Sequence, residues 1–313
     1  AATIAITTGS AATTVTGTTS GDTVTVNATA LVDDTLLTVD GDADVTVTAL
    51  GGNLDNSATG TVSATLADNA DGDYSVTSST AMTLANGTAQ DGDTITLAGA
   101  GAITVTDLVA DLNASTATGA LDVTTFTNGT GAAATIAITT GSAATTVTGT
   151  TSGDTVTVNA TALVDDTLLT VDGDADVTVT ALGGNLDNSA TGTVSATLAD
   201  NADGDYSVTS STAMTLANGT AQDGDTITLA GAGAITVTDL VADLNASTAT
   251  GALDVTTFTN GTGAAATIAI TTGSAATTVT GTTSGDTVTV NATALVDDTL
   301  LTVDGDADVT VTA

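Results

Sequence analysis

The chain has 313 residues, a net charge of −36 at neutral pH, and no lysine, arginine, histidine, cysteine, proline or tryptophan. Its acidic residues are all aspartate, and with no basic side chain to neutralise them they exclude nucleic acid and anionic membranes as partners and favour divalent cations. The composition also excludes disulfides and thiolate metal sites, and no apolar run approaches the roughly 20 residues that a transmembrane helix needs.

Short runs in which apolar and hydroxyl residues alternate predict β-strands, because a period of two places the apolar side chains on one face. Residues 92–106 show the pattern: a Gly-Asp corner, the run Thr-Ile-Thr-Leu, a glycine-rich bend and the run Ile-Thr-Val-Thr. Disorder is the alternative for so acidic a chain, but 41% apolar residues in regular alternation favour an ordered β protein. In chain order, strands are expected near 3–7, 12–16, 23–27, 35–39, 44–48, 61–66, 74–77, 81–85, 94–98, 102–106 and 120–126.

The sequence is an exact tandem repeat. Residues 1–132 recur unchanged as 133–264, and 265–313 reproduce the first 49 residues. We expect two complete repeat units and one truncated unit in one continuous structure, not separate domains. The third copy stops within a unit, and the first residues resemble neither an initiator segment nor a signal peptide, so we expect a stretch of a longer array.

Each repeat contains a fainter half-repeat, Gly21–Asp91 and Gly92–Ser152. Apolar and glycine positions of the two halves match at a constant offset of 58, and the first half carries an extra strand-like insert, Thr23–Asp34. Residues 107–112 alone would fit a helical turn, with leucines four residues apart. The matching segment 49–54 contains paired glycines, which disfavour helices, so we predict that both segments are non-helical.

Strands this short and frequent fit either a parallel β-solenoid or tandem β-sandwich domains. The apolar residues are small, with Tyr74 and Phe126 as the only aromatics of a repeat, whereas immunoglobulin-like sandwiches usually have larger aromatics at the centre. No proline marks a linker, and half-repeats of 61 and 71 residues divide into about three coils each. We therefore predict an all-β fold, a parallel β-solenoid built from 132-residue tandem repeats of about six coils each.

Aspartate clusters are the strongest chemical signal. Asp40, Asp42 and Asp44 alternate with small residues, which would place their carboxylates on one strand face, about 6.8 Å apart. Calcium takes six to eight oxygen ligands in loops of this kind. The alternative is that these are solvated turn residues, selected for backbone geometry and solubility. The candidate calcium ligands are Asp40, Asp42, Asp44, Asp68, Asp71, Asp73, Asp91 and Asp93, with Asp172, Asp174, Asp176, Asp200, Asp203, Asp205, Asp223 and Asp225 in the second unit.

Other motifs have less specific explanations. Asn27, Asn86, Asn113 and Asn128 each begin an N-glycosylation triplet, but the composition favours asparagines stacked inside a coil or at its corners. Catalysis is not expected: the neighbours Asp33-Asp34 would point to opposite faces of a strand, and no basic or thiol side chain exists to activate a nucleophile or stabilise an oxyanion.

Segments such as Gly92–Leu112 and Gly21–Val26, in identical long repeats without lysine or arginine, resemble the giant β-strand-repeat proteins secreted by Gram-negative bacteria, among the RTX-type adhesins and surface-layer proteins. Asp40–Val47 is similar to the glycine-aspartate nonapeptide of that family but lacks its tandem Gly-Gly-x-Gly-x-Asp register. The resemblance implies secretion, a β-rich or β-solenoid fold, and a role on or outside the cell surface.

The sequence thus predicts a non-enzymatic, structural extracellular protein that self-associates end to end or laterally and binds neither nucleic acid nor membrane interior. An alternative is the stalk of a calcium-dependent adhesin made of tandem β-sandwich domains. A third possibility is an ice- or mineral-binding face, which requires Thr94, Thr96, Thr104 and Thr106 to lie in register on one flat side.

Overall fold

The computed structural model describes residues 1–69, 71–127, 133–259 and 265–313. These residues form strands joined by turns and bends, with no helix among them. The fold is an all-β parallel β-solenoid. The chain divides into two compact units, residues 1–158 and 159–313, and both have the same coil design.

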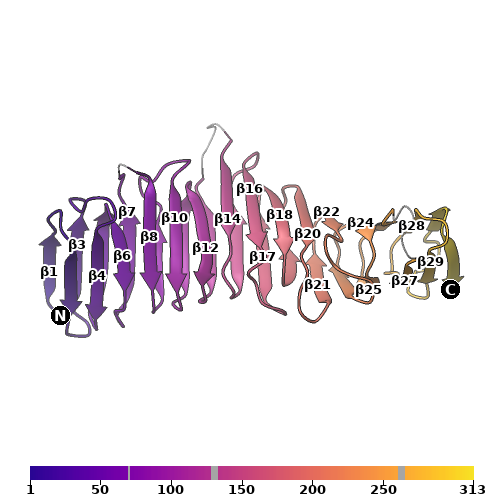
Figure 1. Ribbon diagram of the computed structural model, residues 1–313, viewed down its shortest axis with the longest axis horizontal. Helices are drawn as coiled ribbons and strands as arrows, with labels where there is room; N and C mark the ends of the chain where they lie inside the picture. The colour runs from indigo at the N-terminus through magenta and orange to yellow at the C-terminus, as the bar shows by residue number, and fades with distance from the viewer. Residues whose placement is uncertain (70, 128–132, 260–264) are drawn as a thin grey trace. The chain divides into compact units, whose positions relative to one another are not determined.

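Each coil of the first unit consists of two strands, one in each of two parallel sheets (Figure 1). Successive strands alternate between an odd sheet and an even sheet, and every pair is parallel. The odd sheet comprises β1 (Thr3–Thr7), β3 (Thr23–Ala28), β5 (Asp44–Leu50), β7 (Val62–Leu66), β9 (Met82–Ala85), β11 (Ile103–Leu108), β13 (Leu121–Thr125) and β15 (Thr145–Gly149). The even sheet comprises β2 (Thr13–Gly17), β4 (Leu36–Gly41), β6 (Asn53–Asn56), β8 (Asp73–Ser78), β10 (Thr94–Gly99), β12 (Asp111–Ala117) and β14 (Thr135–Thr139).

The second unit repeats this arrangement, and β16 (Thr155–Ala160) spans the boundary. Its odd-numbered strands are β17 (Leu168–Gly173), β19 (Asn185–Asn188), β21 (Asp205–Ser210), β23 (Thr226–Gly231), β25 (Asp243–Ala249), β27 (Thr267–Thr271), β29 (Thr287–Asn291) and β31 (Asp308–Thr312). Its even-numbered strands are β18 (Asp176–Leu182), β20 (Val194–Leu198), β22 (Met214–Ala217), β24 (Ile235–Leu240), β26 (Leu253–Thr257), β28 (Thr277–Gly281) and β30 (Leu301–Gly305).

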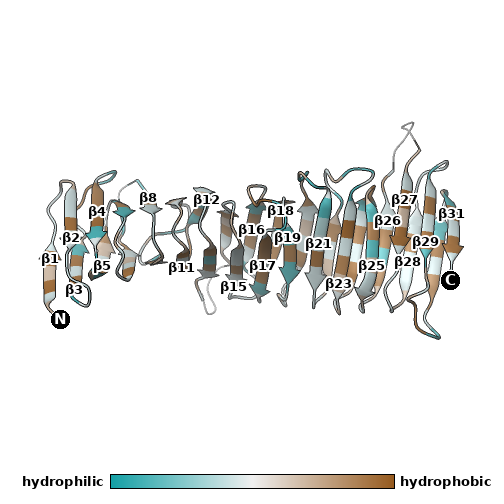
Figure 2. Cartoon of the chain, turned by 90° about the horizontal axis from the view of Figure 1, so that it is seen from below, coloured by the Kyte–Doolittle hydropathy of each residue, from teal (hydrophilic) through white to brown (hydrophobic). Residues whose placement is uncertain are grey.

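Alternation along each strand makes the core. In β5, Val45 and Val47 are buried between the sheets, whereas Thr46 and Thr48 face outward. The same alternation appears as brown and pale bands along the strands in Figure 2. Burying one such aliphatic side chain stabilises the fold by about 1.5–3 kcal/mol, so the coil stack is a series of thin hydrophobic layers.

Glycines at the corners let the coils approach closely. Gly99, at the end of β10, has a φ of +101°, which L side chains rarely adopt. A Cβ at this position would also collide with the carbonyl oxygen of Ser78 in the preceding coil. Asp34 has a φ of +60° without being glycine, which is consistent with the tolerance of aspartate for this region.

The structure confirms the solenoid, and the tandem-sandwich architecture is wrong for both units because every strand pair in them is parallel. All the expected strands are present in the first repeat, within two residues at either end. The structure adds β6 and β12, which follow the corners at 51–52 and 109–110. The segments 49–54 and 107–112 are therefore strand, corner and strand, and the prediction that they are non-helical is confirmed.

The number of strands decides which sheet a repeated segment joins. β14 has the sequence of β1, and 13 strands, β1 to β13, precede it in the described chain. β1 pairs with β3 in the odd sheet, whereas β14 pairs with β12 in the even sheet. In the second unit, β17 and β30 likewise share Leu-Thr-Val-Asp-Gly and lie in different sheets. Because a coil has two strands, an odd number of strands moves each copy to the opposite face.

Candidate functional site

The candidate aspartates lie on two different edges of the first unit. One edge carries the corners that lead from odd to even strands, and the other edge carries those that lead from even to odd strands. Asp42 lies on the second edge, between β4 and β5. Asp68, Asp71 and Asp91 lie on the first edge, after β7 and β9. The predicted ligands therefore do not form one cluster.

Asp40, Asp42 and Asp44 do not share one strand face, so that sequence prediction is wrong. The chain turns from the even to the odd sheet at Asp42, which separates Asp40 in β4 from Asp44 in β5. The Asp42 Oδ1 atom accepts a hydrogen bond from the Thr59 hydroxyl at 2.7 Å, and Asp44 Oδ1 accepts one from the Thr61 backbone N–H at 2.8 Å. Both carboxylates thus tie their corner to the next coil.

The corners after β7 and β9 are neighbours on the first edge. The Gln90 side chain donates to Asp68 Oδ1 at 3.5 Å, and the Gln90 backbone N–H donates to Asp93 Oδ2 at 2.6 Å. Asp71 Oδ1 accepts from the backbone N–H of Asp73 at 3.2 Å. These carboxylates fold their own turns and link adjacent corners.

The same corner encloses Tyr74, which lies in β8 with its ring buried. Its hydroxyl donates to the carbonyl oxygen of Ala67 at 2.9 Å. Burial, followed by the negative charge of Asp93, raises the pKa of Tyr74 from 10.0 to about 12. The pKa of Tyr206 is raised to about 12 by burial and Asp225 in the same way. The carboxylates of this edge therefore act on a buried phenol, and they favour its neutral form.

The second unit reproduces these contacts. Asp174 Oδ1 accepts from the Thr191 hydroxyl at 2.6 Å. In addition, Asp165 Oδ1 accepts from the backbone N–H of Ala202 at 3.2 Å, which links the corners after β16 and β20. The remaining candidates are Asp172 and Asp176 beside the corner between β17 and β18, Asp200, Asp203 and Asp205 between β20 and the start of β21, and Asp223 and Asp225 between β22 and β23.

Within the described residues, no three carboxylates converge into a group that would hold a metal ion. Their observed partners are backbone N–H groups, hydroxyls and the side-chain amides of Gln90 and Gln222. Such hydrogen bonds from backbone to side chain stabilise turns, and the described contacts of these aspartates are of this structural kind.

Sequence reasoning missed Asn56, which is fully buried at the end of β6. Its amide donates to the hydroxyls of Ser78 at 2.9 Å and Thr80 at 3.1 Å, and its Oδ1 accepts from the Ala58 backbone N–H at 3.1 Å. The available signal was its spacing, because it follows the buried Leu54 by two residues and so falls on the inward face.

The asparagines of the glycosylation triplets have different environments. Asn86 is buried; its Oδ1 accepts from the Val109 backbone N–H in the next coil at 3.1 Å, as expected for an asparagine stacked at a corner. Asn27 and Asn113 are exposed, and each accepts a hydrogen bond from the backbone N–H two residues further along, that of Thr29 and of Ser115. Asn128 lies outside the described residues. Asn86 is therefore structural, and an enzyme could not reach it in the folded chain.

The threonines proposed for one flat face lie in two sheets. Thr94 and Thr96 belong to β10 in the even sheet, and Thr104 and Thr106 belong to β11 in the odd sheet, so the row predicted from the sequence is wrong. The odd sheet of the first unit does carry a register-matched outer rank: Thr25, Thr46, Ser63, Thr83, Thr104 and Asp122.

Comparison of the chain with protein-family models, curated proteins and solved structures gives no match. The part of the chain that the structure describes holds no helix with the length and apolar character of a membrane span.

Proposed function

We propose that this chain is a structural, non-enzymatic extracellular protein whose coils build a rod or filament in a surface layer, fibre or biofilm matrix. The observation that supports this most is the strand pairing. In each unit, both strands of an interior coil pair in parallel with the coils before and after it. Coil-to-coil hydrogen bonds of this kind allow coils of one design to be added without a new type of interface.

The repeat length fits this role. We propose that the 132-residue repeat advances six and a half turns, half a turn more than the six coils expected from the sequence, because the copy of a segment lies 13 strands further along the chain. Successive repeats would then present the same residues on alternating faces. Averaged over two repeats, the outer surfaces of the two sheets would then have the same amino-acid composition.

The proposal includes an extracellular location and a relationship to secreted repeat proteins. The absence of lysine and arginine leaves no trypsin site, which suits long survival outside the cell. A charge of −36 without basic side chains argues against binding to nucleic acid. Strands such as β5 bury their apolar side chains and turn hydroxyls outward, which argues against insertion into membrane lipid. Together with the repeats, these features support a relationship to the giant secreted repeat proteins of Gram-negative bacteria.

Calcium is proposed as the cation that the acidic corners attract. Asp68 and Asp93 bond to the side-chain amide and the backbone N–H of Gln90, so one glutamine joins carboxylates of adjacent corners, and the chain has no basic side chain to neutralise them. A divalent cation relieves the repulsion between such groups. We expect weak binding that strengthens the corners, since no described cage is preformed.

Electron microscopy of the purified chain, in calcium and then in excess chelator, tests the proposal. Uniform filaments with an axial repeat of about 4.8 Å are expected, since coils are spaced like neighbouring strands. Chelator should shorten or loosen them if calcium acts at the corners. Isolated single chains under every salt condition would overturn the filament.

The adhesin-stalk alternative loses its architectural basis, because both units are solenoids and not sandwiches. A second candidate has one specific observation in its favour, the register-matched hydroxyl rank of the odd sheet from Thr25 to Thr104. Regular hydroxyls suit an ordered water or mineral surface. Thermal hysteresis of the freezing point tests this candidate, and its absence would exclude ice.

A further inference from the structure

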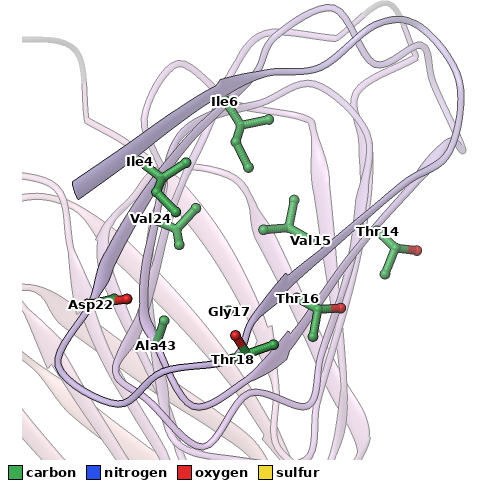
Figure 3. A pocket seen from close by; sticks show the side chains of 10 residues that line it. All are labelled: Ile4, Ile6, Thr14, Val15, Thr16, Gly17, Thr18, Asp22, Val24 and Ala43. Carbon is green, nitrogen blue, oxygen red and sulfur yellow. The ribbon is translucent and has the colours of Figure 1, made fainter. Parts of the chain in front are cut away.

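Phe126 is a large apolar side chain that an interior coil leaves exposed. Figure 3 shows the usual rule in the first coils, where Ile4, Ile6 and Val15 point into the space between the sheets and Thr16 points outward. Phe126 departs from this rule. It follows β13, which pairs with β11 on one side and β15 on the other, and yet it is 46% exposed. Its exposure is therefore not caused by a missing neighbour.

The copy of this residue in the second unit, Phe258, is 45% exposed. It follows β26, which likewise has a partner on each side, β24 and β28. These two residues are the only phenylalanines of the chain. Aromatic side chains contribute strongly to cores and to binding surfaces. A ring that is not enclosed in the core is available for binding.

Phe126 borders an open cavity of about 300 Å³ on the first edge of the first unit. Corners of unequal length explain the cavity. The corner between β11 and β12 consists of Val109 and Ala110 alone, whereas the corner one coil earlier spans residues 86–93. The short corner leaves room beside the longer one, and the cavity lies there.

The cavity combines an apolar lining with one charged residue. Among the described residues that line it, Asp91 alone is polar. The other lining residues are Leu108, Val109, Phe126, Ala133, Ala134 and Ile136. Binding sites for small molecules have this composition, an apolar surface with few polar groups, and volumes from about 300 Å³ upward.

Hydrogen bonds to both neighbouring coils hold the backbone of Phe126. Its N–H donates to the carbonyl oxygen of Leu108 at 3.0 Å. Its own carbonyl oxygen accepts from the hydroxyls of Thr150 at 3.1 Å and Thr151 at 3.4 Å. The ring therefore projects from a fixed backbone, so a ligand would meet it with little ordering of the chain.

The backbone around Asp91 is fixed as well. The Asp93 N–H donates to the carbonyl oxygen of Gln90 at 3.1 Å, and the Gln90 N–H donates to Asp93 Oδ2 at 2.6 Å. These two bonds close a turn with Asp91 and Gly92 at its centre, and glycine adopts the φ of +95° at Gly92 without strain. A preformed turn thus presents a carboxylate beside an apolar surface.

The charge of a suitable ligand follows from the composition of the chain. With 36 aspartates and no lysine, arginine or histidine, no side chain of the protein can neutralise Asp91. An anion would be repelled, whereas a cation is attracted by the carboxylate and by the face of the Phe126 ring. An apolar body on the same cation would cover the aliphatic lining, which a hydrated metal ion cannot do.

We propose that this cavity binds a small organic ammonium ion with an apolar body. The ammonium group lies against the Asp91 carboxylate, and the apolar body lies against the Phe126 ring and the aliphatic lining. This site goes beyond the proposed structural role and does not depend on filament formation.

The second unit has the residues and contacts for an equivalent site. The Phe258 N–H donates to the carbonyl oxygen of Leu240 at 3.0 Å. Asp223 lies in a turn that is closed by a bond of 2.6 Å from the Gln222 N–H to Asp225 Oδ2. Variants that test the site must therefore change both copies of a residue.

Equilibrium dialysis of the full chain tests the site, because it measures bound ligand whether the chains are single or assembled. The probe is benzylammonium, and the matched neutral control is benzyl alcohol, which has the same ring and nearly the same size. Dialysis in about 0.15 M sodium chloride shortens the screening length to about 8 Å and so reduces the general attraction of cations to the acidic chain. We expect a dissociation constant on the order of 1 mM for benzylammonium and about fivefold weaker binding of benzyl alcohol.

Two double variants test the named side chains. Phe126→Leu with Phe258→Leu keeps an apolar side chain but removes the ring face, and should weaken benzylammonium binding by about fivefold. Asp91→Asn with Asp223→Asn should reduce the affinity for benzylammonium to that for benzyl alcohol. All four side chains are exposed, so the variants should keep the fold, which circular dichroism checks.

The matched control is Asp122→Asn with Asp254→Asn, which removes the same charge from the outer faces of β13 and β26 and should leave the affinity unchanged. Equal weakening by this control and by the Asp91 and Asp223 pair would overturn the site, since benzylammonium would then respond to the charge of the whole chain. Equal affinity for the two probes, no binding of either, or unchanged affinity in the phenylalanine variants would also overturn it. Filaments in the microscope, present or absent, bear only on the proposed function.

Discussion

The same residue recurs in different surroundings along this chain, so one substitution can be compared between a buried copy and an exposed copy. Replacing a buried isoleucine by alanine removes packed methyl groups and leaves a cavity, at a cost of about 2–5 kcal/mol. We expect this loss for Ile136→Ala and Ile268→Ala, which are buried, and a much smaller loss for Ile4→Ala, which is exposed. Urea denaturation at low salt measures the free energy of unfolding. Equal losses at all three sites would contradict the burial described here.

Substitutions at two corner glycines distinguish the cost of backbone strain from the cost of a steric collision. Gly92 and Gly99 both have positive φ, at +95° and +101°. A Cβ at Gly92 meets nothing within 4 Å, whereas one at Gly99 collides with Ser78. Gly92→Ala should therefore cost only the strain of a left-handed residue, about 1–2 kcal/mol, and Gly99→Ala should cost more. Thermal denaturation of the two variants compares them directly, and a smaller loss for Gly99→Ala would show that the coil spacing adapts to the side chain.

The two buried tyrosines make the free energy of unfolding depend on pH in the alkaline range. In the unfolded chain a phenol ionises near pH 10, whereas Tyr74 and Tyr206 stay protonated to about pH 12 when folded. The folded state therefore binds more protons between these values, so the free energy of unfolding falls from pH 10 to 12 and is unaffected by these groups below pH 10. Ultraviolet absorbance of the phenolate follows the titration. The double variant Tyr74→Phe and Tyr206→Phe should lose this pH dependence, and a phenolate signal complete by pH 10 in the folded chain would refute it.

At the level of elements, buried asparagines connect coils at the corners. Asn86→Ala would leave the Val109 backbone N–H without its acceptor, at a cost of about 1–3 kcal/mol. Asn27→Ala is the matched control, because Asn27 is exposed and its side chain bonds to Thr29, two residues further along. We expect a small change there. Hydrogen exchange at Val109 reports the contact locally, and unchanged protection in Asn86→Ala would exclude the link between coils.

The sequence predicts most strands and misses two for a physical reason. β6 is Asn-Leu-Asp-Asn and β12 begins Asp-Leu-Asn, so polar residues conceal the alternation around a single leucine. Their strand conformation is imposed by pairing with β4 and β8, and with β10 and β14, which is tertiary information. The prediction that Asp40, Asp42 and Asp44 share one strand face is wrong for a similar reason, because continued alternation does not reveal that the chain turns at Asp42.

The insert Thr23–Asp34 determines which of the two sheets a segment joins in the next repeat. The offset of 58 carries β4 to β10 and β5 to β11, six strands or three coils onward and in the same sheet. The insert adds β3 to the first half, which makes the total 13, an odd number. The sequence alignment detected the insert, but its consequence requires knowing that one coil contains two strands.

For the whole molecule, electrostatics is almost entirely repulsive, because the chain carries 36 acidic side chains and no basic ones. Salt can therefore only screen repulsion and breaks no side-chain ion pair. We expect the melting temperature to rise with sodium chloride between about 0.01 M and 0.15 M, as the screening length falls from about 30 to 8 Å.

Calcium chloride at matched ionic strength should raise the melting temperature further if the corners bind the cation. The double variant Asp68→Asn and Asp93→Asn should lose that additional rise, whereas Asp122→Asn, on the outer face of β13, should keep it. If calcium and sodium raise the melting temperature equally at matched ionic strength, the corner aspartates are structural hydrogen-bond acceptors and the calcium proposal is wrong.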